Sequence, residues 1–122
     1  MYTIEKRTEN GTNIAIVHAQ ERVIVDAGSA LDLLMDAKYN ADSCRIAIDK
    51  TLVADEFFIL SSGMAGEILQ KYINYGGKIA FYGDYSHYTS KPLHDFIRES
   101  NKGRDVFFVS TLAEAVAKLT NA

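Results

Sequence analysis

Short apolar runs of strand length alternate along this chain with amphipathic segments that have the period of a helix. The runs expected to form buried strands are residues 13–18, 44–48, 78–83 and 106–109. Strands separated by helical segments are typical of a parallel sheet, because a parallel pair needs a long crossover connection. The sequence therefore predicts an α/β fold, with a mostly parallel sheet and helices packed on it.

The chain opens with a predicted hairpin. Residues 2–7 alternate apolar and polar side chains, as a half-buried strand does, and Asn10-Gly11 is a strong signal for a two-residue turn. Residues 13–18 are then a second, antiparallel strand, so we expect a mixed sheet. The complete order is β-β-α-β-α-β-α-β-α, and right-handed crossovers leave few arrangements for it.

Each predicted helix is marked by residues that favour helix ends. The expected N-terminal markers are Ser29 with Asp32, Ser90 with Pro92, and Thr111 with Glu114. The first helix is expected to turn inward Leu31, Leu34 and Met35. The helix over 63–75 is expected to end at Gly76-Gly77. Its predicted inward residues are Met64, Ile68, Leu69, Tyr72 and Ile73.

Length and charge limit the kind of protein this can be. We expect residues 1–122 to form a single domain, since this length is enough for a sizeable core. Lys and Arg number 13 and Asp and Glu 16, a net charge of −3 that disfavours nucleic-acid binding. No apolar run reaches the length of a membrane span, and the first residues do not resemble a signal peptide. The expected location is therefore the cytoplasm.

The usual catalytic and cofactor motifs are not found. His18, His87 and His94 do not have the spacing of metal ligands on one helix, and the lone cysteine, Cys44, offers no paired-cysteine site. The glycines form neither a phosphate-binding loop nor a dinucleotide-binding pattern. No nucleophile, base and orienting acid stand at a convincing spacing, so the sequence favours a protein without metal, cofactor or catalysis.

The first candidate site is the entry to the second helix, where Ser61, Ser62 and Gly63 follow an expected core pair, Phe57-Phe58. The first amides of a helix lack partners within it, so a hydroxyl there is either a cap or a phosphorylation site. Gly63 and Gly66 keep this turn open to another surface; alternatively, Gly66 lets the helix pack tightly on the sheet.

The second candidate site is the segment 83–103, which follows the carboxyl end of a strand, where ligands bind in open α/β sheets. It carries Asp84, Tyr85, His87 and Tyr88 close together, after Tyr82. Tyrosine-rich loops suit interfaces, because the ring gives area and the hydroxyl gives direction. The alternative is an ordered loop that only covers the sheet edge.

The first candidate site resembles that of the STAS fold of bacterial anti-sigma-factor antagonists. There a strand leads to an Asp-Ser-Ser-Gly-like turn, a helix, a glycine-rich turn and another strand. Ser61-Ser62-Gly63 and Gly76-Gly77-Lys78 match this pattern, whereas Leu60 stands where that family has its aspartate. The resemblance implies a STAS-like fold, phosphorylation of Ser62 by a partner kinase, and binding to an anti-sigma-like protein.

A second resemblance covers residues 12–119. The strings DEFFILSSGMAGEILQKYINYGGKIAFYGDYS and DFIRESNKGRDVFFVSTLAEA are similar to a bacterial family known as domain of unknown function 4180. This resemblance implies little biochemistry.

Together these features predict a non-catalytic regulatory domain that acts through protein contact. Its surface would combine the start of the 63–75 helix with the 84–91 loop, since both follow strand carboxyl ends. A homodimer formed through the tyrosine-bearing loop is also expected. The alternative is a small-molecule binder or enzyme that uses Ser62, Asp84 and His87 as its polar groups.

Overall fold

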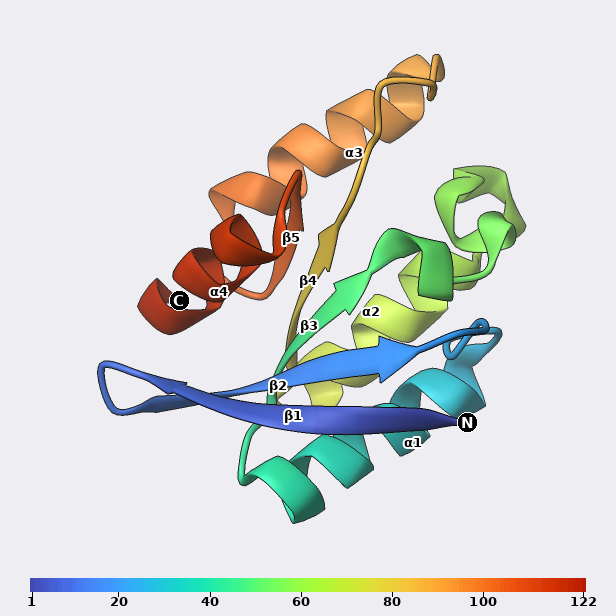
Figure 1. Ribbon diagram of the computed structural model, residues 1–122. Coiled ribbons are helices and arrows are strands. Elements are labelled where there is room, and N and C mark those ends of the chain that lie inside the picture. Colours follow the sequence, from blue (N-terminus) through green and yellow to red (C-terminus); the bar gives the residue numbers. More distant parts are fainter.

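The computed structural model describes residues 1–122 and contains one five-stranded sheet with helices on both faces (Figure 1). Its strands are β1 (Tyr2–Glu9), β2 (Thr12–Ala19), β3 (Arg45–Asp49), β4 (Lys78–Tyr82) and β5 (Val106–Val109). They lie in sequence order, with β1 antiparallel to β2 and all other neighbours parallel. The predicted mixed, mostly parallel α/β architecture is confirmed.

Four helices alternate with the strands from β2 onward. They are α1 (Ala27–Ala41), α2 (Met64–Asn74), α3 (Lys91–Lys102) and α4 (Leu112–Asn121). Because β2 to β5 lie in sequence order, right-handed crossovers place α1, α2 and α3 on the same face. Helix α4 follows the last strand, is not a crossover, and covers the opposite face (Figure 1).

The alternation of side chains along each strand divides the core into two layers. Under α1 and α2, the parallel strands contribute large side chains such as Ile48, Phe81 and Phe108. Under α4, the facing residues include Ala47 and Ala80 on the two central strands. The small alanine side chains leave room for a single helix to lie close to the sheet.

The start of α1 corrects one expectation. The N-cap is Asp26 rather than Ser29: Asp26 Oδ1 accepts from the Ser29 amide at 2.7 Å, and Ser29 Oγ accepts from the Asp26 amide at 3.1 Å. This reciprocal pair starts the helix earlier than predicted. The buried face is set by Leu33 and Leu34 with small alanines beside them, whereas Met35, expected inside, is 38% exposed.

Helix α2 ends as predicted. The Gly77 amide donates to Tyr72 O at 2.7 Å and the Gly76 amide to Ile73 O at 3.2 Å, which is the Schellman arrangement. Gly76 has a φ of +72°, and a Cβ on Gly77 would lie 2.8 Å from the Leu34 side chain, so both positions need glycine. Ile73, expected inside, is 55% exposed, since it lies outside the face that Ile68, Leu69 and Tyr72 bury.

The predicted starts of the last two helices are confirmed. Ser90 Oγ accepts from the Leu93 amide at 3.3 Å, with Pro92 in the first turn of α3. Thr111 Oγ1 accepts from the Glu114 amide at 3.2 Å and opens α4. Cys44 is half-buried beside the core, immediately before β3.

Candidate functional site

A groove of about 660 Å³ lies at the carboxyl-terminal side of the sheet. One wall is the segment 55–61, which follows β3, and the other is the segment 87–93, which follows β4 and enters α3. Its lining residues are Asp55, Phe58, Ile59, Leu60, Ser61, His87, Tyr88, Thr89, Ser90, Pro92 and Leu93. The two candidate segments of the sequence therefore meet here, as expected from parallel strands whose carboxyl ends share one side of a sheet.

The first wall is a chain of three short 3₁₀ turns, at Lys50–Leu52, Asp55–Phe58 and Leu60–Ser62. Phe57 and Phe58 are buried, as predicted, and hold the wall against the core. Ile59 between them and the last turn is 53% exposed. Asp55 at the rim pairs with Arg22 at 3.0 Å.

Ser62 links the first wall to the start of α2 by hydrogen bonds. Its Oγ donates to the carbonyl of Glu56 at 2.6 Å and accepts from the Met64 amide at 3.2 Å. The residue is exposed, and the N-cap position itself belongs to Gly63, which has a φ of +80°. Ser61 lines the groove, whereas Ser62 does not.

Gly66 does not have the packing role considered for it. The residue is exposed in the first turn of α2, and a Cβ built there would meet nothing within 4 Å. Tight packing on the sheet is therefore wrong as an explanation of this glycine. At an exposed position inside a helix, glycine is less stable than alanine by about 0.5–1 kcal/mol.

Lys50 connects the two walls, and the sequence did not single it out. Its Nζ lies 5.6 Å from the ring centroid of Phe58, 5.8 Å from that of Tyr85 and 4.9 Å from that of Tyr88. Gly83 makes room for the lysine stem, since a Cβ there would lie 2.6 Å from Lys50 Cγ. We call Lys50 with these three rings the lysine cage. An ammonium over several aromatic faces is attracted by their quadrupoles, so the cage holds the loop after β4 against the loop after β3.

The tyrosines in and before the second wall are half-buried, and their rings pack against the protein. The Tyr85 hydroxyl donates to Phe81 O at 2.9 Å, and burial raises the pKa of Tyr85. The Tyr88 ring stacks on Phe58 with centroids 5.5 Å apart. Tyr82 packs against the α4 layer, on the opposite face of the sheet. The three tyrosines of the candidate interface are thus divided between the two core layers.

The polar residues of this loop have separate roles. Asp84 Oδ1 accepts from the Ser86 amide at 2.8 Å, and this hydrogen bond lowers the pKa of Asp84. His87 is exposed on the groove rim, with its ring 4.3 Å from that of Tyr88. His94 bonds through Nε2 to the carbonyl of Tyr88 and ties α3 to the loop. Of Ser62, Asp84 and His87, only His87 lines the groove.

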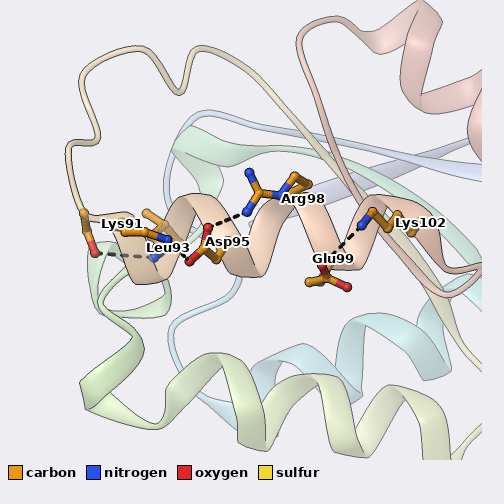
Figure 2. A network of polar contacts seen from close by, with 7 residues as sticks. Lys91, Leu93, Asp95, Arg98, Glu99 and Lys102 are labelled. Atoms are coloured by element: carbon orange, nitrogen blue, oxygen red, sulfur yellow. Dashed lines mark hydrogen bonds and ion pairs between the residues drawn. The ribbon is translucent and has the colours of Figure 1, made fainter.

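The start of α3 completes the second wall. Leu93 is buried at its base, and Ser90 caps the helix at the rim. Figure 2 shows Leu93 in the first turn of α3. Along the outer side of α3, Asp95 pairs with Lys91 at 2.7 Å and with Arg98 at 2.6 Å. The Lys91 hydrogen bond is the main cause of the lowered pKa of Asp95. These exposed pairs stabilise the helix only slightly.

Two further properties describe the molecule as a whole. No group of three His, Cys, Asp or Glu side chains is arranged to hold a metal ion. None of the helices combines the length and the apolar character that a membrane span requires.

The fold and the groove define an α/β domain with a half-open apolar site beside the carboxyl ends of its parallel strands. The chain belongs to the family described as Domain of unknown function (DUF4180), whose model matches residues 9–119. No curated protein matches it. Among solved structures it is similar to a candidate anti-sigma factor antagonist from Thermotoga maritima, with 16% identity and a TM-score of 0.48 over 96% of this chain and 94% of that one.

Proposed function

We propose that this protein is a non-catalytic interaction domain whose groove receives an apolar segment of a protein partner. The observation that carries the proposal is the composition of the groove. Its apolar lining includes Phe58, Ile59, Leu60 and Leu93. A rim of hydroxyl groups from Ser61, Thr89 and Ser90 surrounds that lining. An apolar centre with a polar rim is the common anatomy of a protein interface.

Ile59 is the expected anchor of the interaction. It is 53% exposed, although Phe58 before it is buried and Leu60 after it packs partly against the core. Covering a large aliphatic side chain is favourable at roughly 25 cal/mol per Å² of apolar surface removed from water. A partner side chain seated between Ile59 and Tyr88 would gain this area from both walls, and the lysine cage keeps the walls in place beforehand.

Ser62 is the proposed point of control, by a partner kinase. Phosphorylation replaces the hydroxyl hydrogen that Ser62 donates to Glu56 O, so the turn that closes the first wall loses this bond. The added negative charge would be attracted to the start of α2 and repelled by Asp55 and Glu56. Modification is therefore expected to shift the segment 56–62 and change the affinity for the partner, as an anti-sigma-like regulatory pair would need.

A small molecule in the same groove is the second candidate function. The volume of about 660 Å³ supports it, because small-molecule sites commonly enclose roughly 300–1,000 Å³. Its polar contacts would come from His87, Ser61 and the hydroxyls of Thr89 and Ser90, with Ser62 and Asp84 outside the lining.

The test compares two isoleucines of similar exposure, Ile59 and Ile73. Ile59→Asp places a charge in the groove, and Ile73→Asp places the same charge on α2 outside the groove lining, where the side chain is 55% exposed. Tagged wild-type protein and both variants are used for cross-linked capture from the host cell. We expect one protein partner to be retained by the wild type and Ile73→Asp and lost with Ile59→Asp.

Two results would contradict the proposal. Equal capture by Ile59→Asp would place the interface elsewhere. A small molecule seen by native mass spectrometry on the wild type, and absent from Ile59→Asp, would favour the second function. For Ser62, the Ser62→Asp and Ser62→Ala variants should differ in partner capture while unfolding at similar temperatures; identical capture would argue against control at this residue.

A further inference from the structure

We propose that the chain forms a two-fold symmetric dimer in which β1 pairs antiparallel with β1 of a second copy. The contact joins two five-stranded sheets into one and leaves both grooves free. The proposal does not depend on the function of the groove, because β1 lies at the far edge of the sheet from β4 and β5 (Figure 1).

The two edge strands of the sheet, β5 and β1, differ in whether other groups cover their outward backbone N–H and C=O groups. Strand β5 is short, all of its residues are buried, and α3 packs beside it. The side-chain amide of Asn101 bonds to both backbone groups of Phe108, accepting from N at 2.7 Å and donating to O at 3.0 Å. This amide occupies the position of a further strand, so the β5 edge is closed to pairing.

The β1 edge has no such cover. Asn10 and Gly11 both have positive φ, which is the geometry of a two-residue type I′ turn. In such a hairpin the residues that flank the turn, Glu9 and Thr12, form a hydrogen-bonded pair, and bonding alternates from there. The backbone N–H and C=O groups that point away from β2 therefore belong to Tyr2, Ile4, Lys6 and Thr8. The only backbone hydrogen bonds of β1 are those of the hairpin.

The charges of β1 favour a pairing register centred on Lys6 over the two registers centred on its neighbours. In a two-fold antiparallel pair centred on Lys6, Glu5 of each copy lies opposite Arg7 of the other. A register centred on Glu5 would pair Glu5 with itself, and one centred on Arg7 would pair Arg7 with itself, without forming the Glu5–Arg7 ion pairs. Glu5 already accepts from Arg7 at 2.9 Å and bonds to His18 at 2.8 Å within one copy. The dimer extends this ion-pair network across the new strand pair.

Helix α1 adds apolar surface on the same side of the molecule. The Tyr2 hydroxyl donates to Asp36, which places this part of α1 beside the start of β1. Met35 is next to Tyr2 in the same surface depression, and it is 38% exposed. Tyr39 lies one turn further along the same side of the helix and is 89% exposed. A continuous sheet brings this stripe of the two copies toward each other.

Lys6 limits the strength of the dimer, because it lies opposite itself at the two-fold axis. Charged residues, lysine above all, commonly weaken strand pairing at an edge. The expected dimer is therefore reversible. Removing the charge in Lys6→Ala should tighten the dissociation constant by about two- to fivefold, the range of a single cross-strand pair.

The main test uses charge reversal and analytical ultracentrifugation over a wide concentration range. The wild type should show a monomer–dimer equilibrium. Glu5→Arg and Arg7→Glu should each be monomeric, since each places like charges opposite each other, and an equal mixture of the two should dimerise again. Thermal unfolding of each single variant shows whether the fold is retained, and Tyr39→Ser should weaken the dimer without affecting the fold.

A backbone variant separates strand pairing from charge. Lys6→Pro removes an outward N–H and leaves the β1–β2 bonds in place, so it should abolish dimerisation in a folded protein. The proposal is overturned if the wild type stays monomeric at every concentration, or if the mixture of the two charge variants stays monomeric while both are folded. A dimer that Lys6→Pro does not weaken would also overturn it, because association would then use another surface.

Discussion

The same strands form both layers of the core, but the side chains on their two faces differ in size. On the α4 side, Ala47 of β3 lies beside Ala80 of β4, and one helix fills the space. On the other side, the next pair in the register is Ile48 beside Phe81, and this layer is thick and aromatic. The aromatic layer also continues beyond the strand ends into the groove, whereas the layer under α4 does not contribute to the groove lining.

The continuity has a physical basis in ring contacts. The Phe81 ring lies 4.9 Å from Phe57 and 5.2 Å from Phe108, and Phe58 continues the cluster to Tyr88 in the groove lining. The site is therefore the outer end of one core layer. A change in that layer should reach the groove, and a change in the other layer should not.

The largest expected effect comes from Phe81→Ala, compared with Phe107→Ala on the opposite face. Both phenylalanines are buried on neighbouring strands, and each truncation should lower the free energy of unfolding by about 3–5 kcal/mol. Only Phe81→Ala should also speed amide hydrogen exchange over residues 84–90, because the rings that hold this loop lose their support. Equal exchange in both variants would break the distinction between the layers.

Ala80→Leu tests the layer under α4 by adding volume rather than removing it. The side chain is fully buried against α4, so the larger residue should cost roughly 1–3 kcal/mol through overpacking. NMR shift changes are expected in α4 and β4. Large changes at Ile59 or Tyr88 would show that the two layers are not independent.

Lys50→Met tests the lysine cage, and Lys71→Met, at an exposed position of α2, is its control. Methionine keeps an unbranched stem beside Gly83 and removes the charge over the rings. The expected loss is about 1 kcal/mol of stability, together with faster exchange in the 84–89 loop. No difference between the two variants would mean that the cation does not fix the loop.

The smallest expected effect is a loss of stability in acid. The pKa of Asp84 and that of Asp95 are both lowered from the usual 3.8 by hydrogen bonds in the folded state. A lowered folded-state pKa contributes stability above 3.8, and this contribution is lost as the pH falls through the folded value. Asp84→Asn keeps a side-chain acceptor for Ser86 and does not titrate, so its urea midpoint should depend less on pH below 4. Identical pH profiles for the variant and the wild type would contradict the assignment.

Local sequence determined the order of elements and most of their ends. The signals that worked act through hydrogen bonds within a few residues of themselves, so their patterns predicted the hairpin, the end of α2 and two helix starts. They are Asn10-Gly11, Gly76-Gly77, Ser90 and Thr111. The meeting of the two candidate segments also followed from sequence, because parallel strands bring their carboxyl ends to one side.

Tertiary structure decided which way the side chains turned. Met35 and Ile73 fit an inward face by spacing, but the helices rotate to place other residues on the sheet. Tyrosine is common at interfaces, yet Phe58 and Phe108 contact the ring of Tyr85, and its hydroxyl donates a hydrogen bond to Phe81 O. The lysine cage joins residues 50, 58, 85 and 88 from two separate loops, and the missing side chain at Gly83 admits the lysine stem. Spacing along the chain reports local geometry, whereas burial depends on what the folded chain brings opposite each residue.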